Sequence, residues 1–325
     1  MRRALLIGIN AYPNGHTLYG CIEDINNLAN SIERNGDGSK NFDVKKCPDL
    51  RNSNDAVTQI KQLFHDDIEV ALFYFSGHGY IDADGGQMVF PDDILEPSRI
   101  KGIKMSELMD IVNQSKAKSK IVVLDCCHSG FIGKGPSTTP CSTLNTGVSI
   151  LTACREDEYA NELGGHGVFT ELLCSALKGG AADFCGNITI GSIYSYIDRS
   201  LGAWDQRPIF KTNVTEFVPI KTVNPTVEMS EIRKITELFS DANTQLPLNP
   251  SFEFTNSPDY KHEIVVPYAS NDNVQIFKTL QKLQSIGFVE PVGEQHMYFA
   301  AMHNKECRLT ELGKYYWRLV KNNRL

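Results

Sequence analysis

No apolar run in this 325-residue sequence approaches the ~20 residues that a membrane-spanning helix requires, so we expect no membrane segment. The nine cysteines include no CxxC pair and their number is odd, which fits neither a zinc ribbon nor a fully paired disulfide framework. A Gly-rich phosphate-binding loop is also missing. These absences predict a cytoplasmic protein with reduced thiols, without a bound metal or other cofactor.

The first residues resemble a short signal peptide, but a core strand explains them better. The apolar run extends only from Ala4 to Ile9, and Asn10 interrupts it. This run is shorter than the ~7–15 apolar residues of a secretion signal. We therefore predict a buried first strand over residues 4–10.

The net charge of −7 is carried entirely by residues 1–220. Residues 221–325 contain 12 basic and 12 acidic residues, which leaves 20 basic and 27 acidic residues for the rest. An acidic surface does not attract nucleic acid, whereas it favours a cationic peptide substrate.

Strand patterns and helix patterns alternate over residues 1–220. Short runs rich in β-branched and aromatic residues predict six strands, at 4–10, 42–47, 70–75, 121–124, 148–153 and 208–212. Helical spacing predicts one helix that starts at residue 21 and ends before Asn35, and others at about 53–65, 105–114, 167–177 and 190–201. This alternation predicts an α/β domain with a mostly parallel sheet flanked by helices.

Reactive side chains follow two of the predicted strands. The strand at 70–75 runs into SGHGY, and the strand at 121–124 runs into DCCHSG. Ligands and catalytic groups in open α/β sheets gather beyond the carboxyl ends of the strands. If the two strands are neighbours, His78 and Cys127 leave the sheet at the same edge.

His78 and Cys127 have the chemistry of a catalytic pair. A thiol with a pKa near 8.5 is mostly protonated at neutral pH, and it needs a base or a positive field to become a nucleophile. His78 can supply either. An isolated cysteine after a strand is usually a small buried residue. Two alternatives stay open: strand alternation sends Cys126 to the face opposite Cys127, and His128 is a second candidate base.

The motifs SGHG and DCCHSG, with His78 and Cys127 49 residues apart, resemble those of the metacaspase and paracaspase branch of the caspase-like cysteine peptidases. The resemblance covers about residues 1–220 and implies a caspase-like fold. It also implies that Cys127 is the nucleophile, that Cys126 is a packing residue, and that His78 is the catalytic partner. The amide N–H groups of Gly79 and Cys127 would then form the oxyanion hole.

The same resemblance implies a preference for basic residues at the cleavage site. Family members that cut after Arg or Lys have one pocket carboxylate in a GCxxD motif and another two residues before the cysteine, which correspond to Asp24 and Asp125. Caspases that cut after Asp carry an arginine near the position of Leu18. A buried carboxylate pair is costly without a cation, and the fork of an Arg side chain suits it well. The structural alternatives are a capping or solvated Asp24 and a backbone-bonding Asp125.

Calcium activates many metacaspases, and the stretch DADGG at 82–86, followed by Asp92 and Asp93, contains suitable carboxylates. It lacks the 12-residue EF-hand pattern with its terminal Glu. We therefore expect a solvated hairpin here rather than a calcium site.

Residues 225–325 form a second predicted domain. Helices at 228–242 and 273–286, a hairpin, and a last helix that starts near residue 309 resemble a winged-helix domain. DNA binding is not expected, because phosphate contacts require clustered Lys and Arg. We predict a regulatory module that binds another protein.

The sequence thus predicts a cysteine endopeptidase that cleaves proteins after Arg or Lys. By fold-level analogy, a caspase-like domain joined to a small helical module is typical of regulated proteolysis, including prokaryotic defence and cell death. The alternative is a catalytically silent caspase-like scaffold with a DNA- or protein-binding winged helix.

Overall fold

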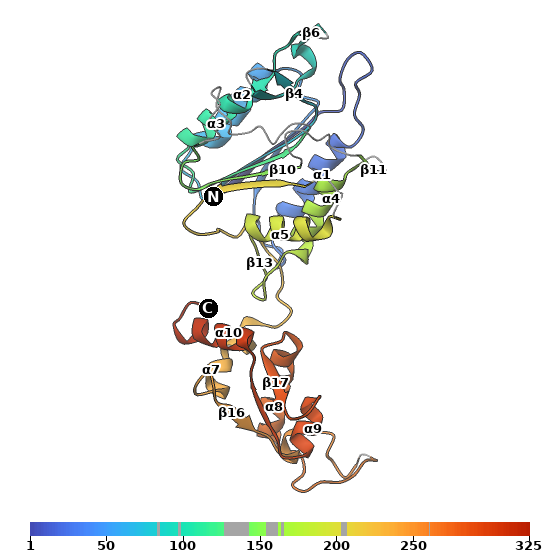
Figure 1. The fold of residues 1–325 in the computed structure, drawn as a ribbon, viewed down its shortest axis with the longest axis vertical. Coiled ribbons are helices and arrows are strands. Elements are labelled where there is room, and N and C mark those ends of the chain that lie inside the picture. Colours follow the sequence, from blue (N-terminus) through green and yellow to red (C-terminus); the bar gives the residue numbers. More distant parts are fainter. Residues whose placement is uncertain are drawn as a thin grey trace. The chain divides into compact units, whose positions relative to one another are not determined.

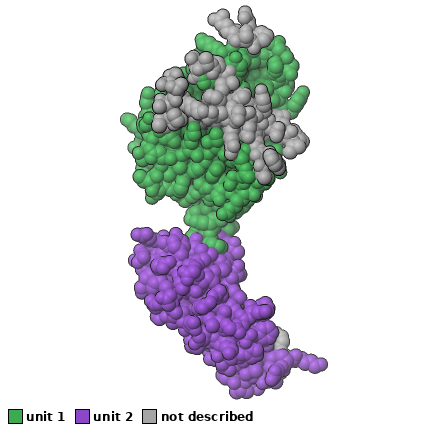
Figure 2. Space-filling view, viewed as in Figure 1, with its two compact units in different colours: residues 1–224 green, residues 225–325 purple. Residues whose placement is uncertain are grey.

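The computed structural model describes residues 1–82, 85–96, 99–126, 143–153, 162–163, 166–202, 207–259 and 261–325. The chain divides into two compact units, Met1–Asn224 and Pro225–Leu325 (Figure 2). In the described ranges, no helix is both long enough and apolar enough to span a bilayer.

A six-stranded sheet forms the centre of the first unit (Figure 1). The strand order is β14-β10-β9-β3-β1-β2, and all neighbouring strands are parallel except β14 and β10. The strands are β1 (Arg2–Gly8), β2 (Asp43–Pro48), β3 (Val70–Ser76), β9 (Ser119–Asp125), β10 (Val148–Thr152) and β14 (Ile209–Asn213). The predicted mostly parallel, six-stranded α/β architecture is therefore confirmed.

Helices cover both faces of this sheet because its central strands are apolar on both sides. In β3, Phe73 and Phe75 point to one face, while Leu72 and Tyr74 point to the other. A strand buried on both faces requires such an unbroken apolar run. The first face is covered by α2 (Ser53–His65) and α3 (Met105–Gln114), and the second by α1 (Cys21–Ile32), α4 (Val168–Ser175) and α5 (Ile190–Ser200) (Figure 1).

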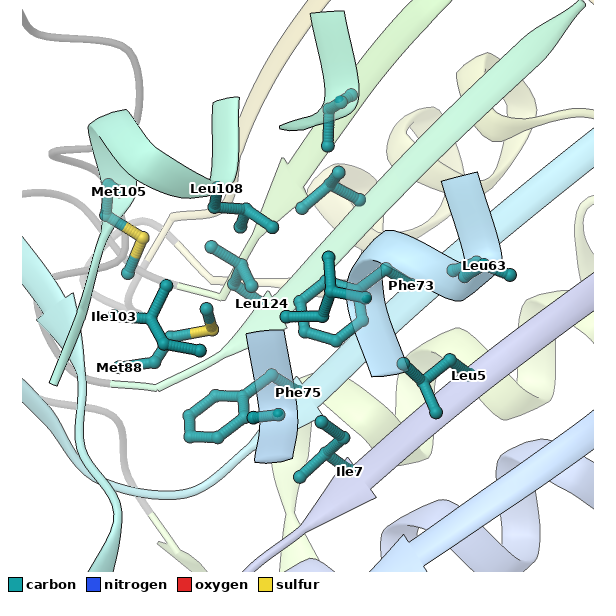
Figure 3. Close-up of a cluster of buried hydrophobic side chains, with 14 of the residues drawn as sticks. Leu5, Ile7, Leu63, Phe73, Phe75, Met88, Ile103, Met105, Leu108 and Leu124 are labelled. Carbon is teal, nitrogen blue, oxygen red and sulfur yellow. The ribbon is translucent and has the colours of Figure 1, made fainter. Parts of the chain in front are cut away.

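The core on the first face is drawn in Figure 3. Leu5 and Ile7 from β1 share it with Leu63 from α2 and Leu108 from α3. Each fully buried aliphatic or aromatic side chain contributes roughly 1.5–3 kcal/mol relative to its exposed state. The packing therefore holds the strand ends, where the site residues follow, on a rigid support.

Residues 79–104 contain a small three-stranded sheet, of which the sequence analysis expected only a hairpin at residues 82–86. The strands β4 (Gly79–Asp82) and β5 (Gly85–Met88) form an antiparallel hairpin, and β8 (Ile103–Lys104) pairs with β5. The expected hairpin at residues 82–86 is confirmed by the pairing of β4 with β5, but the expectation that it is solvated was wrong for β5, whose residues Gly86–Met88 are buried. The hairpin is rich in Gly and Asp, but Met88 is buried in the same core as Met105 and Leu108.

The first unit also contains several short elements. They are η1 (Pro91–Asp93), β6 (Ile94–Glu96), β7 (Arg99–Ile100), β11 (Glu162–Leu163), β12 (His166–Gly167), the π-helical turn η3 (Ala176–Gly180), β13 (Asn187–Ile188) and β15 (Lys221–Thr222).

The second unit is built around the antiparallel sheet β16-β18-β17. Its elements are α6 (Met229–Arg233), α7 (Ile235–Leu238), β16 (Gln245–Pro247), η4 (Pro250–Phe252), α8 (Asn271–Ser285), β17 (Val289–Val292), α9 (Met297–Met302), β18 (Glu306–Leu309) and α10 (Glu311–Lys321). The winged-helix resemblance of this unit stays a prediction.

The first predicted helix of this unit is shorter than expected. We predicted one helix over 228–242, but the chain forms two short helices and leaves the second at Phe239. Phe239 is fully buried, and its carbonyl oxygen accepts a hydrogen bond from Trp317 Nε1 at 2.7 Å. This tertiary contact, which local spacing does not reveal, accompanies the end of the helix.

Candidate active site

His78 lies between the carboxyl end of β3 and the start of β4, and its side chain is oriented by the loop between β1 and α1. Its ring packs against Tyr12 with centroids 4.5 Å apart, and its Nε2 lies 2.7 Å from the carbonyl oxygen of His16. Because a carbonyl oxygen only accepts hydrogen bonds, Nε2 must carry the proton in this contact. In the neutral ring, Nδ1 is then the nitrogen that can accept a proton from a nucleophile.

A buried tyrosine anchors the backbone of His78. The Tyr12 hydroxyl accepts a hydrogen bond from the His78 N–H and donates one to the Val89 carbonyl, both at 3.0 Å. Burial raises the pKa of Tyr12 well above its ordinary value, so the hydroxyl keeps its proton. The Val89 N–H in turn donates to the His78 carbonyl at 3.0 Å. Tyr12 therefore joins His78 to the hairpin that follows it.

The glycine before His78 allows this close approach. A β-carbon on Gly77 would lie 2.6 Å from the Tyr12 hydroxyl oxygen and 2.9 Å from Phe75 Cζ, which is too close for either atom. Gly79, the predicted oxyanion-hole residue, begins β4 opposite Met88. Its role in catalysis stays a prediction.

Asp24 lies in the first turn of α1, and contacts at the start of this helix fix its position at the end of the sheet. Asn10 accepts a hydrogen bond from the Cys21 N–H at 3.0 Å and donates one to the Tyr19 carbonyl at 3.2 Å. Gly8 lets the helix pass close to β1, because a β-carbon there would overlap the Cys21 carbonyl. Asp24, in the first turn of α1, is consequently 4% exposed.

The structure brings Asp24 and Asp125 to the same end of the sheet. Asp125 is the last residue of β9, is 8% exposed, and lies opposite Ser76 in the parallel pair of β3 and β9. The Ser76 hydroxyl donates a hydrogen bond to Asp24 Oδ2 at 3.3 Å. Ser76 therefore bonds one of the carboxylates that the sequence analysis selected and lies beside the other in the sheet.

Sequence analysis missed a further partner of Asp125. Thr170 in α4 donates a hydrogen bond from Oγ1 to Asp125 Oδ2 at 2.7 Å, and the Tyr74 hydroxyl lies 2.6 Å from the same Oγ1. The pKa of Tyr74 is raised, first by burial and then by the negative charges of Asp125 and Asp24. Both carboxylates thus act on one buried hydroxyl. Thr170 lies within an ordinary amphipathic pattern, so nothing in the sequence distinguishes it.

The predicted nucleophile, Cys127, lies outside the described residues, as does the alternative base His128. The preceding residue, Cys126, is 1% exposed and belongs to the core beneath α2 and α3.

Within the described ranges, no three His, Cys, Asp or Glu side chains gather in a way that could hold a metal ion. Asp92 pairs with Arg51, and Asp93 accepts a hydrogen bond from the Ser53 N–H at the start of α2. These two carboxylates, which we considered for calcium, therefore fix η1 to α2.

The family model of the caspase domain (Peptidase C14) matches residues 1–236. The chain belongs to the caspase domain family. Among curated relatives, metacaspase-1A of Aspergillus terreus is 30% identical over 146 residues, which cover 40% of this chain and 36% of that protein. Metacaspase-7 of Arabidopsis thaliana is 28% identical over 202 residues, covering 57% and 46%, respectively. Metacaspase-2 of Trypanosoma brucei brucei is 22% identical over 277 residues, covering 73% and 77%.

Solved structures agree with this assignment at the level of the fold. Caspase-1 from Spodoptera frugiperda aligns with a TM-score of 0.50 and 15% identity, covering 69% of this chain and 91% of that chain. Protein GSU0716 from Geobacter sulfurreducens aligns with a TM-score of 0.50 and 17% identity, covering 69% and 100%. The predicted membership in a family of cysteine peptidases is confirmed, although the chain spans only about a third of the length of the Aspergillus relative.

Proposed function

We propose that this caspase-family protein is a cysteine endopeptidase that cleaves protein substrates after Arg or Lys. The Cys127 thiolate attacks the scissile carbonyl carbon, and His78 gives the thiol proton to the leaving amine. Water, deprotonated by His78, then hydrolyses the acyl-enzyme and regenerates the thiol. The amide N–H groups of Gly79 and Cys127 stabilise the oxyanion in both steps.

The observation that carries the specificity is the burial of two carboxylates, Asp24 and Asp125, at one end of the sheet. Ser76 and Thr170 give them hydrogen bonds from neutral hydroxyls. A guest cation adds to these neutral donors a charge interaction that is strong in a buried site. A guanidinium group adds charge-assisted bonds in a planar fork, and an ammonium group adds them from a point charge.

The contacts of His78 support its role as the base. The bond from Nε2 to the His16 carbonyl leaves Nδ1 as the proton acceptor, and Tyr12 fixes the backbone that carries the ring. A base oriented by a further group is the usual arrangement around an activated nucleophile.

Peptide reporters with Arg, Lys or Asp before the leaving group test the proposal. We expect hydrolysis of the Arg and Lys reporters only. Cys127→Ala and His78→Ala should each lower kcat/KM by at least about 1,000-fold. Asp24→Asn and Asp125→Asn should lower it by about 30-fold or more, because each leaves the cation with one partner fewer in a buried pocket.

Asp110→Asn is the matched control, because Asp110 is an exposed aspartate on α3 in the same unit. Its variant should behave like the wild type. Sustained turnover by Cys127→Ala would refute the nucleophile, and equal hydrolysis of the Asp reporter would refute the specificity.

We also propose that residues 225–325 act as a regulatory, protein-binding domain and not as a DNA-binding one. Several of its cations are paired within the unit: Lys234 and Lys282 with Glu231, and Arg308 with Glu290. Cations paired in this way are less available to phosphates. Salt-dependent binding of duplex DNA to the full chain would contradict this part of the proposal.

The thiols are consistent with a cytoplasmic enzyme, which we propose. Among the cysteines of the described ranges, Cys47, Cys174, Cys185 and Cys307 are free thiols, and Cys47 and Cys185 are half-buried. Free thiols of this number are typical of a reducing compartment.

A further inference from the structure

A chain of three buried groups lies behind the proposed specificity pocket. The Thr170 hydroxyl has a single proton, and it donates this proton to Asp125 Oδ2 at 2.7 Å. The Tyr74 hydroxyl must then donate its own proton to Thr170 Oγ1, at 2.6 Å. The direction of the chain is therefore fixed, from Tyr74 through Thr170 to Asp125.

All three members are more than nine-tenths buried: Tyr74 is 0%, Thr170 2% and Asp125 8% exposed. Hydrogen bonds in such surroundings strengthen one another, and a missing member leaves a buried polar group with a lost bond. The members also come from three elements, β3, α4 and β9, which pack against one another. The orientation of the Asp125 carboxylate therefore depends on how α4 packs on the second face of the sheet.

We propose that Thr170 is a positioning residue for substrate recognition, which holds the Asp125 carboxylate in one orientation for a cationic side chain. Tyr74 orients Thr170 from behind. This inference rests on the proposed function, because it assigns to Thr170 and Tyr74 the preparation of the same pocket. Neither hydroxyl needs to touch the substrate for this role.

Steady-state kinetics with the Arg reporter separate the hydroxyl of Thr170 from its shape. Thr170→Val keeps the shape and removes the hydroxyl, and it should raise KM about 10-fold, the loss typical of one hydrogen bond to a charged group. Thr170→Ser keeps the hydroxyl and should stay close to the wild type. Tyr74→Phe should give a smaller increase, about 3-fold. Thr58→Val, at an exposed position on α2, is the control.

A second readout excludes a merely structural effect. Alkylation of Cys127 by iodoacetamide, followed by mass spectrometry, requires no basic side chain, so Thr170→Val should leave its rate unchanged, with kcat also within about twofold. A wild-type KM in Thr170→Val, equal losses in the Ser and Val variants, or slower alkylation of Cys127 would each overturn the inference. If Thr170→Val does not fold, Tyr74→Phe is compared with the wild type instead, because it removes only the hydroxyl oxygen that bonds to Thr170.

Benzamidine distinguishes a failure of this inference from a failure of the proposed function. The wild type must hydrolyse Arg or Lys reporters for the proposed function to stand, whatever the Thr170 variants do. Binding of benzamidine, a planar cation, is measured by calorimetry on the full chain and needs no turnover. About 10-fold weaker binding to Thr170→Val than to Thr170→Ser supports the inference. Equal binding to both variants, or none to the wild type, overturns it.

Discussion

Substitution of Gly77 by alanine is the sharpest perturbation that the site offers. The added β-carbon would lie 2.6 Å from the Tyr12 hydroxyl oxygen and 2.9 Å from Phe75 Cζ. Both rings are buried, at 4% and 0% exposure, so neither can move into solvent. The Tyr12 hydroxyl must shift, and its bonds to the His78 N–H and the Val89 carbonyl are lost or lengthened.

The expected cost follows from these contacts. Overpacking a tight core costs about 1–3 kcal/mol, and the two buried hydrogen bonds contribute about 0.5–1.5 kcal/mol each. We therefore expect Gly77→Ala to lose about 2–6 kcal/mol of unfolding free energy, which lowers the melting temperature by roughly 4–24 °C. Because residue 78 moves with its anchor, kcat should also fall by at least about 10-fold.

Thermal melts and Arg-reporter kinetics on the full chain measure both effects. Gly191→Ala is the control: its β-carbon meets Phe217 at 3.2 Å, and that ring is 45% exposed and can move aside. Adding Tyr12→Phe to Gly77→Ala removes the clashing oxygen and should recover part of the stability but little of the activity. A Gly77→Ala protein that melts and turns over like the wild type would refute the packing argument.

Three further predictions concern the hydroxyl that anchors His78, an ion pair at low pH, and a helix cap in the second unit. Tyr12→Phe removes that hydroxyl, so reporter kinetics should show kcat about 10-fold lower and KM unchanged, and an unchanged kcat would contradict the anchor. Hydrogen bonds from Arg2 lower the pKa of Glu69, so their stabilisation is present above about pH 4.3 and is lost as the pH falls through the lowered pKa. Urea denaturation of Arg2→Gln and wild type should accordingly differ at pH 7 and converge in acid; a difference that persists at low pH would exclude this pair as its cause. Thr310 caps α10, so Thr310→Ala should cost about 1–2 kcal/mol in urea denaturation, and an unchanged midpoint would refute the cap.

Local patterns were sufficient for the main sheet, whereas they did not indicate that the hairpin after His78 is buried and pairs with a third strand. The run VALFYF predicts β3 because a strand buried on both faces needs apolar residues at every position. The strand Gly85–Met88 has no such run. Its two glycines and Gln87 give no apolar pattern that would indicate the burial of Met88. Met88 is buried against the same core as Met105 and Leu108, which belong to α3, a helix that follows later in the chain.

The same distinction applies to the site. Short motifs selected His78, Asp24 and Asp125, because their neighbours in the sequence carry the signal. Tyr12 acts on a residue 66 positions away, and Thr170 acts on one 45 positions away. Such supporting contacts follow from the packing of whole elements, so a single sequence does not reveal them.

The central claim is that Cys127 is the nucleophile of a pocket that accepts a basic side chain. The most direct measurement is mass spectrometry of the full chain after treatment with a peptide chloromethyl ketone that ends in Arg, and in parallel with one that ends in Asp. The account predicts one adduct, on Cys127, with the Arg probe only, and its formation should be slowed about 30-fold or more in Asp125→Asn. An adduct on Cys126 or another cysteine, or equal labelling by the Asp probe, would contradict it.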